Sequence, residues 1–272
     1  MFLVGLALVY LVARVVREQQ VASDQLAHAL RAKTDFIADA SHELRTPLTV
    51  LRGNAEIALE LDRTCVHTEL LEEIVEESER MTELVEDLLF LARSDAETLP
   101  LQTEAVETGL FMAGLAERAE TLARDRRVLF ETSLNADGTV RIDRSRVEQV
   151  ALILVDNASK FSPLDQPVTL RSCTRGGDLV VEVADWGPGI PEAELNSIFE
   201  RFYRVDKARA RNQGGAGLGL AIAKTIVEAH GGWIKAQSRD GEGTLMAFGI
   251  PLCAAAGADA RSSQPKAAGE VP

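Results

Sequence analysis

Cysteine is scarce in this chain, and its distribution excludes two common uses. Cys65, Cys173 and Cys253 lie far apart, and no two of them form a C-x-x-C pair. Neither a zinc site nor a disulfide framework is indicated, and a reducing cytosol is the expected compartment.

Basic residues are also few relative to acidic ones. The chain has 29 Lys and Arg against 42 Asp and Glu, a formal net charge of -13. Contact with nucleic-acid phosphates needs clustered positive charge, so DNA or RNA is not an expected partner. The hydrophobic fraction of 46% is ordinary for a globular protein and allows one substantial domain plus a smaller element.

A long apolar run occurs only at the N-terminus. Residues 1–13 are continuously apolar, and Arg14 then interrupts the run. This is shorter than the roughly 20 apolar residues that a spanning helix needs. The end of a longer transmembrane helix, a short span and a signal-peptide-like start are three alternatives. We favour a partial or short transmembrane segment over residues 1–16, with Arg14 and Arg17 on the cytoplasmic side of the cell inner membrane.

Glycine and proline are almost absent from the next part of the chain. Between Val15 and Leu99 only Pro47 and Gly53 occur. The first helix repeats apolar residues every seven positions, at Leu30, Ile37, Leu44, Leu51 and Ala58, with Leu48 and Ala55 between them. The second helix carries a wide apolar stripe: Leu70, Leu71, Ile74, Val75, Met81, Leu84, Val85, Leu88, Leu89 and Leu91.

These two patterns predict a helical linker over residues 17–33 and a helical hairpin over residues 34–96. A hairpin with so wide an apolar face cannot bury it alone. Pairing with a second copy into a four-helix bundle buries that face, so we expect a homodimer.

After a break near Pro100 the pattern becomes mixed helix and strand. Helices are expected over residues 110–124 and, after an N-cap at Asp143, to about Lys160. Strands are expected over residues 128–133, 140–142, 168–172, 179–184, 233–238 and 244–250. The fold class is therefore α+β, with the hairpin followed by a two-layer α/β domain over residues 100–252. The tail, residues 253–272, has no periodicity and is expected to be disordered.

The first helix carries the string D-A-S-H-E-L-R-T-P-L-T at residues 39–49. If Leu44 and Leu48 are core positions, His42, Glu43 and Thr46 face solvent. Glu43 can then take a proton from one ring nitrogen while the other nitrogen acts as a nucleophile. A surface His on a helix is by itself usually without a catalytic role, but this string is more specific than a lone His.

Three further motifs lie in the α/β region. Asn157 is on a helix and offers an amide oxygen suited to Mg2+. Asp185 ends a strand and is followed by Gly187 and Gly189, whose lack of side chains permits close approach to a ligand. The run G-A-G-L-G-L at residues 215–220 opens a helix, where backbone donors can meet phosphate oxygens.

Between the last two motifs lies the string I-F-E-R-F-Y-R at residues 198–204. Taken together, these strings resemble the H, N, G1, F and G2 boxes of sensor histidine kinases, over about residues 34–251. The resemblance implies a dimerising phosphoacceptor hairpin and an ATP-binding domain of the Bergerat type. It implies that His42 is the phosphorylation site, that Glu43 assists the proton transfer, and that Thr46 positions water for dephosphorylation of a partner.

The resemblance also implies the nucleotide site. Asn157 would hold Mg2+, Asp185 would accept a hydrogen bond from the adenine amino group, and Lys160 and Arg204 would approach the ribose or phosphates. The other implied ATP-binding residues are Gly187, Gly189, Ile190, Phe199, Gly215, Gly217, Leu218 and Gly219. Residues 207–214 would form a lid over the triphosphate.

One position departs from the family pattern. Four residues before Asn157 the family usually has another Asn, whereas this chain has Ile153. The substitution removes a polar group near the metal. ATPases of the same fold place a Glu there to activate water, which Ile153 cannot do, so transfer to an imidazole is favoured over hydrolysis.

The expected activity is ATP-dependent autophosphorylation of His42, followed by transfer to an Asp of a response regulator in a two-component signalling system. The alternative is a dimeric scaffold with a degenerate nucleotide site that regulates a partner kinase. A serine kinase or ATP hydrolase on the same fold is a third reading. Autophosphorylation within one subunit and between subunits both remain open.

Overall fold

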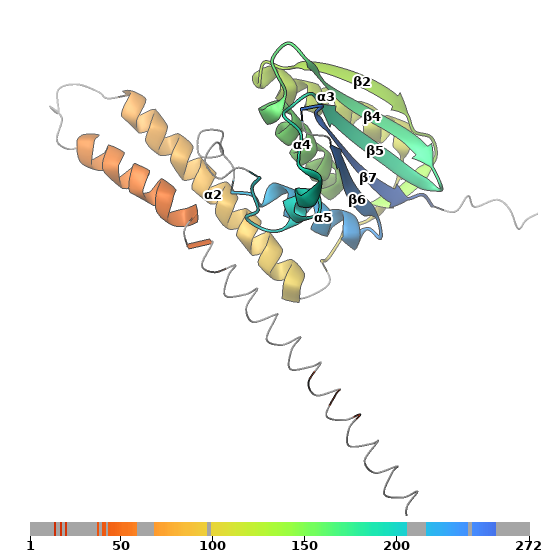
Figure 1. Cartoon of the computed structure of the whole chain (residues 1–272), viewed down its shortest axis with the longest axis horizontal. Coiled ribbons are helices and arrows are strands. Elements are labelled where there is room, and N and C mark those ends of the chain that lie inside the picture. The colour runs from red at the N-terminus through yellow and green to blue at the C-terminus, as the bar shows by residue number, and fades with distance from the viewer. Residues whose placement is uncertain are drawn as a thin grey trace, which may run out of the picture. The chain divides into compact units, whose positions relative to one another are not determined.

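The computed structural model describes residues 14, 17, 20, 37, 40, 41, 43–58, 68–96, 99–205, 216–238 and 241–253. The chain divides into two compact units, Met1–Leu89 and Phe90–Pro272, whose elements Figure 1 shows. The predicted membrane segment, apart from Arg14, lies outside the described residues, and so does the predicted tail after Cys253.

The first unit contains a helical hairpin. Residues 43–58 are helical, and α2 (Thr68–Ala96) begins in this unit and ends in the next. The Asn54 side chain donates a hydrogen bond to Glu73 Oε2 at 2.9 Å, which links the two helices. None of the helices in the described part of the chain combines the length and hydropathy needed to cross a bilayer.

The second unit is built on a five-stranded sheet in the order β2-β4-β5-β7-β6. Its strands are β2 (Leu129–Asn135), β4 (Pro167–Arg175), β5 (Asp178–Asp185), β6 (Trp233–Ser238) and β7 (Thr244–Pro251). Only β2 and β4 are parallel, and the other neighbours are antiparallel. A small second sheet pairs β1 (Glu104–Glu107) with β3 (Thr139–Ile142).

Three helices cover one face of the five-stranded sheet (Figure 1): α3 (Thr108–Asp125), α4 (Arg144–Phe161) and α5 (Gly219–Ala229). The core between helices and sheet is apolar and closed. Its largest fully buried side chains include Phe111, Leu115, Leu154, Leu170, Ile222, Ile226 and Phe248. The helical hairpin and the two-layer α/β unit confirm the predicted fold class.

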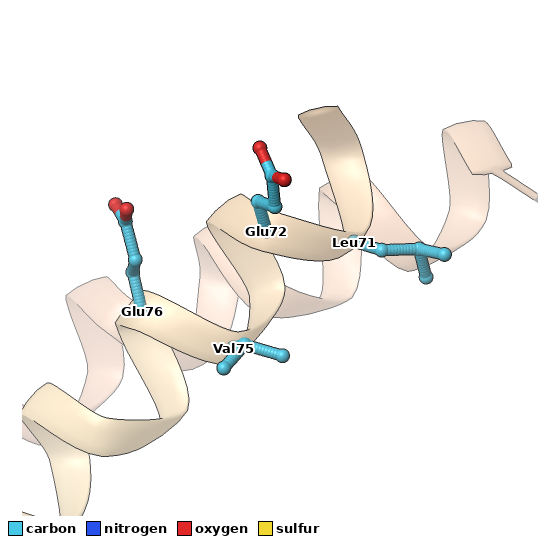
Figure 2. Close-up of a pocket in the computed structure, with 4 residues that line it drawn as sticks. All are labelled: Leu71, Glu72, Val75 and Glu76. Carbon is cyan, nitrogen blue, oxygen red and sulfur yellow. The ribbon is translucent and has the colours of Figure 1, made fainter. Parts of the chain in front are cut away.

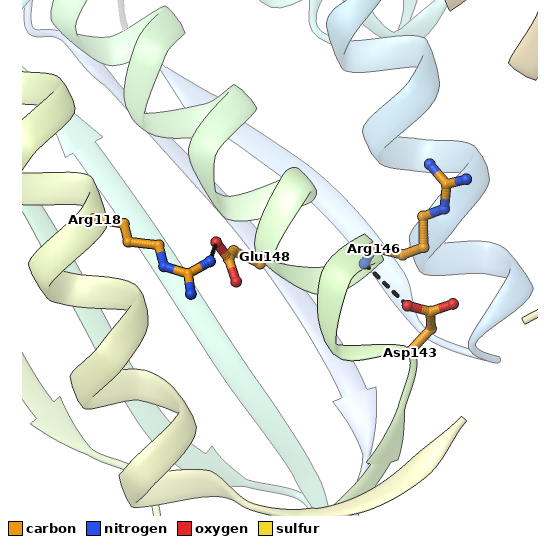
Figure 3. A network of polar contacts seen from close by, with 4 residues as sticks. All are labelled: Arg118, Asp143, Arg146 and Glu148. Atoms are coloured by element: carbon orange, nitrogen blue, oxygen red, sulfur yellow. Dashed lines mark hydrogen bonds and ion pairs between the residues drawn. The ribbon is translucent and has the colours of Figure 1, made fainter. Parts of the chain in front are cut away.

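Helix α4, which carries Asn157, is anchored at its start. Asp143 Oδ1 accepts a hydrogen bond from the backbone N–H of Arg146 at 3.2 Å, so Asp143 is the N-cap that the sequence predicts (Figure 3). Arg118 of α3 forms an ion pair with Glu148 of α4 (Figure 3). The cap fixes where α4 begins, and therefore where Asn157 lies along it.

The Asp143 cap is also tied to α5. The backbone N–H of Asp143 donates to His230 Nε2 at 3.0 Å, while His230 Nδ1 contacts the Ile226 carbonyl oxygen at 2.8 Å. Because Nε2 accepts this hydrogen bond, Nδ1 is the ring nitrogen that faces the Ile226 carbonyl oxygen as a donor. The C-terminal end of α5 is thereby held against the start of α4.

The predicted strands of the α/β region are all present. Four of them are longer than expected by one or two residues, β4 is longer by four, and β6 has the expected ends. Strand β1 was not predicted, and α3 begins two residues before the expected start at Leu110. The reason is that Glu107 caps α3, accepting hydrogen bonds from the backbone N–H groups of Gly109 and Leu110 at 2.8 and 2.7 Å.

Candidate functional site

The segment around the predicted phosphoacceptor is partly described. His42 itself lies outside the described residues. Thr46 is exposed, as predicted, but Glu43 is half-buried and not fully solvent-facing. Glu43 lies one turn before Pro47, which is buried, and the two share a side of the helix. Leu48, a predicted core position, is 57% exposed in the single chain.

Asn157 lies near the C-terminal end of α4 and is half-buried. One turn earlier, Ile153 packs against the first residue of α5: a Cβ added to Gly219 would lie 3.2 Å from Ile153 Cγ2. This distance is shorter than an ordinary van der Waals contact, so the close approach depends on glycine at position 219. Ile153 therefore provides an apolar contact between α4 and α5 where the family usually has an amide.

Asp185 ends β5 beside the glycine loop. Its Oδ1 accepts a hydrogen bond from the backbone N–H of Gly187 at 2.7 Å. Burial raises the pKa of Asp185, and hydrogen bonds from the backbone N–H groups of Gly187 and Thr244 act in the opposite direction. The carboxylate is thus held in place, and it is partly removed from water.

The glycine loop after Asp185 touches the end of α4. A Cβ on Gly187 would lie 2.9 Å from both Asp185 Oδ1 and the Phe161 carbonyl oxygen. No side chain fits there without a shift of the backbone. Glycine at this position lets the loop after β5 approach the last residue of the Asn157 helix.

The predicted F and G2 segments also meet. The backbone N–H of Phe202 donates to the Gly217 carbonyl oxygen at 2.9 Å. Gly217 has φ +72°, and a Cβ there would lie 2.9 Å from the Tyr203 carbonyl oxygen. Phe202 has φ +59°, a left-handed conformation that is unusual for a bulky residue. Strain of this kind often accompanies a functional site.

The structure therefore brings the G1 segment to the end of α4, the G2 segment to Ile153 of α4, and the F segment to the G2 segment. Ile190, in the glycine loop, donates its backbone N–H to Ser238 Oγ at 2.8 Å. Gly189 adopts φ +79°, Leu218 is buried, and Phe199 and Arg204 are half-buried. Gly215 and the predicted lid, residues 207–214, lie outside the described residues.

Lys160 is in an environment that the sequence did not predict. Its Nζ lies 2.5 Å from Asp156 Oδ2, in an ion pair along one face of α4. The other carboxylate oxygen, Asp156 Oδ1, accepts from Arg126 Nη2 at 2.8 Å. The approach of Lys160 to a nucleotide remains a prediction.

Two contacts at the site could not be found from the motifs. The G2 run signals close approach of a backbone, but it does not say that Ile153 is the neighbour of Gly219. Nothing in the string around Phe202 indicates a positive φ. Only the contact with Gly219 had a signal in the sequence, namely the departure from the family pattern at Ile153.

Two grooves are also present, and neither coincides with the convergence of the predicted motifs. One, of about 470 Å³, lies between α3 and α4 and is lined by Arg118, Leu122, Ser145, Glu148, Gln149, Leu152, Ile153 and Asp156. A smaller one, of about 270 Å³, lies on α2 and is lined by Leu71, Glu72, Val75 and Glu76 (Figure 2). Neither groove is lined by Asp185 or by the motif glycines. We therefore define the candidate site by the positions of the motif residues and not by a groove.

The convergence fits a nucleotide. A helix start with glycines offers backbone N–H groups to phosphate oxygens, and Asp185 offers a partly buried acceptor. Among the described residues, no group of three or more His, Cys, Asp or Glu could hold a metal ion. Mg2+ commonly retains water and phosphate ligands, so the single amide oxygen of Asn157 is a suitable protein contribution.

Two protein families match the chain in sequence. Residues 32–97 match "His Kinase A (phospho-acceptor) domain". Residues 142–254 match "Histidine kinase-, DNA gyrase B-, and HSP90-like ATPase".

Individual histidine kinases also match the chain in sequence. Sensor histidine kinase WalK of Bacillus subtilis is 39% identical over 80% of this chain and 36% of its own length. Signal transduction histidine-protein kinase ArlS of Staphylococcus epidermidis is 35% identical over 84% of this chain and 50% of its own length. The chain thus spans half or less of the length of these relatives.

Among solved structures, full-length ShkA in complex with AMPPNP is similar, with a TM-score of 0.61 and 27% identity. The match covers 79% of this chain and 45% of ShkA. The likeness includes both the hairpin and the α/β unit.

Proposed function

Because the chain belongs to the sensor histidine kinases, with a phosphoacceptor hairpin followed by a histidine kinase-type ATPase domain, we propose that it is a protein-histidine kinase (EC 2.7.13.3) that uses MgATP to phosphorylate His42. The observation that carries the proposal is the meeting of Gly187 with Phe161, of Gly219 with Ile153 and of Gly217 with Tyr203. These contacts assemble the predicted nucleotide motifs around one helix. ShkA, of the same fold, binds the ATP analogue AMPPNP.

In the nucleotide site, Asp185 accepts a hydrogen bond from the adenine amino group. Its ionised form is the stronger acceptor, and the backbone N–H of Gly187 fixes the orientation of the carboxylate. The N-terminus of α5, with Gly217 and Gly219, faces the phosphates with backbone donors. Asn157 would hold Mg2+, which when bound would supply positive charge to the phosphate oxygens.

The reaction is an in-line phosphoryl transfer. One ring nitrogen of His42 forms a bond to the γ-phosphorus while the bond between that phosphorus and the β,γ-bridging oxygen breaks, and ADP leaves. Glu43 takes the proton from the other ring nitrogen. Glu43 is half-buried, and partial removal from water strengthens its interaction with the positive charge that develops on the imidazole.

The phosphoryl group then passes from His42 to an Asp of a response regulator, and Thr46 positions water when the phosphorylated regulator is hydrolysed. Thr46 is exposed, so its hydroxyl is accessible to a bound partner. Residues 1–16 anchor the chain in the cell inner membrane, with the kinase core in the cytoplasm.

The hairpin acts as a homodimer. Along α2, Leu71, Val75, Val85 and Leu89 are 40–55% exposed in the single chain, and Figure 2 shows Leu71 and Val75 projecting from the helix. They are separated by four, ten and four positions, which places them on one side of the helix. Association with a second hairpin removes this side from water.

Labelling with γ-³²P-ATP tests the activity. The full chain, incubated with magnesium, should incorporate label that is lost in acid and stable in base, as phosphohistidine is. His42→Gln and Asn157→Ala should abolish incorporation, the former with nucleotide binding intact and the latter with binding weakened. Acid-stable label, or label that persists in His42→Gln, would instead indicate a hydroxyl acceptor. Binding of ATP without labelling would favour the regulatory scaffold.

A further inference from the structure

Asp156 is shared between two cations from two different elements. Its Oδ2 lies 2.5 Å from Lys160 Nζ, and its Oδ1 accepts from Arg126 Nη2 at 2.8 Å. Arg126 is the C-cap residue of α3, whereas Asp156 and Lys160 both lie on α4. The side chains of Asp156 and Lys160 are 25% and 19% exposed, so this pair is better shielded than an ordinary surface pair.

Lys160 lies between the carboxylate and the candidate metal ligand. It follows Asp156 by four residues and Asn157 by three, so on a helix it is a neighbour of both. The flexible four-carbon stem of lysine allows its ammonium group to move between two partners on adjacent sides of a helix. In the structure the ammonium group of Lys160 is paired with Asp156.

We propose that Asp156 is a positioning residue that withdraws Lys160 from the nucleotide, and that Arg126 keeps Asp156 neutralised when Lys160 moves to a phosphate. This inference rests on the proposed function, because it needs a triphosphate beside Asn157. A carboxylate left without a partner in a partly buried position is costly. With one cation on each oxygen, Asp156 can release Lys160 and still retain Arg126.

The proposal assigns opposite effects to two neighbouring residues. Asp156→Asn keeps the shape of the side chain but frees Lys160, so nucleotide binding should tighten. Arg126→Met removes the second cation, so Asp156 should hold Lys160 more strongly and nucleotide binding should weaken. Partly exposed ion pairs of this type shift equilibria by about two- to fivefold, which is the size expected in each direction.

The same two helices provide a matched control. Arg118 and Glu148 form another ion pair between α3 and α4, two turns closer to the start of α4 than Asp156 (Figure 3). Glu148→Gln and Arg118→Met remove comparable charges without touching Lys160. Neither change should alter nucleotide affinity beyond the error of the measurement.

The experiment measures the dissociation constant of a fluorescent ATP analogue with magnesium, using the full chain. The variants are Asp156→Asn, Arg126→Met, Lys160→Met and the double variant Asp156→Asn with Lys160→Met. In the double-mutant cycle, Asp156→Asn should have no effect once Lys160 is absent. Thermal unfolding without nucleotide is recorded for each variant, because a purely structural ion pair would change stability and leave affinity unaltered.

Three results would overturn the inference. Asp156→Asn could leave affinity equal to that of Glu148→Gln. It could tighten binding equally in the Lys160→Met background, which would mean that Asp156 simply repels the triphosphate. Arg126→Met could change affinity in the same direction as Asp156→Asn. In these cases a wild-type chain that binds the analogue leaves the proposed function intact, whereas a wild-type chain that binds none overturns both.

Discussion

The two units bury their apolar side chains to very different degrees. In the α/β unit, Leu154, Ile226 and Phe248 are completely buried. On the hairpin, Leu71 and Val75 are more than half exposed in the single chain. The α/β unit therefore closes its own core, while the hairpin presents an apolar surface that the proposed dimer would cover. A unit with a closed core suits nucleotide binding, and one with an exposed apolar surface suits dimerisation.

The closed core of the α/β unit gives the largest expected effect. Phe248→Ala on β7 should lower the free energy of unfolding by about 3–5 kcal/mol, because it removes a fully buried aromatic ring and leaves a cavity. Urea denaturation followed by circular dichroism measures the change. Leu129→Ala on β2 is the control, since Leu129 is 56% exposed and should cost less than about 1 kcal/mol. Equal losses of unfolding free energy in the two variants would contradict the account of a closed core.

Because the apolar surface of the hairpin is exposed in the single chain, charged substitutions on it should weaken dimerisation. Leu71→Glu combined with Val75→Glu should raise the dimer dissociation constant at least about tenfold, because each copy would lose the burial of two apolar side chains. Sedimentation velocity of the full chain measures it. Glu72→Gln with Glu76→Gln, from the same groove (Figure 2), should leave the dimer intact. Dimers that persist unchanged with two glutamates in place of Leu71 and Val75 would place the interface elsewhere.

In the α/β unit, Asp185 predicts an effect on nucleotide affinity. Asp185→Asn should weaken binding of an ATP analogue about tenfold, since a hydrogen bond to a charged acceptor is lost. In the wild type, burial raises the pKa of Asp185, so protonation as pH falls should begin above the range of an ordinary Asp. Affinity should therefore decline on acidification, and the part of the decline that is due to Asp185 should be missing in Asp185→Asn. Parallel pH profiles of the two proteins would contradict this role.

The smallest expected effect is on stability, and it comes from Asp87 on α2 of the hairpin. Burial, together with Glu83 and Glu86, raises the pKa of Asp87 from 3.8 to about 6. The folded state then binds the proton more tightly than the unfolded state, so Asp87 lowers stability as pH rises from about 4 to about 6. Because the group is partly exposed and screened, Asp87→Asn should stabilise by no more than about 1 kcal/mol at pH 7.5. The gain should vanish near pH 4, and a gain that is independent of pH would contradict the assignment.

Local signals in the sequence predicted much of the α/β unit. Asp143 was identified as a cap because a short acidic side chain precedes a helical pattern, and it does cap α4. Strand β6 has the predicted ends, because alternation and turn residues define it. Glu107 was missed as a cap, since Glu is not a common N-cap residue.

Contacts between distant segments could not be predicted in the same way. The approach of Ile153 to Gly219 and the left-handed backbone of Phe202 depend on how α4, α5 and the F segment pack, and no local pattern encodes this. The pairing of Lys160 with Asp156 and Arg126 also needs the end of α3 in place. Motifs identified the chemistry of the residues, and packing decides which partner each one has.

The most direct test of the account is the site of phosphorylation. After incubation with MgATP, the peptide that contains His42 is analysed by mass spectrometry at neutral pH. The account predicts one phosphate on His42 that disappears after brief acid treatment. A peptide without phosphate, or phosphate on a Ser or Thr that survives acid, would contradict it.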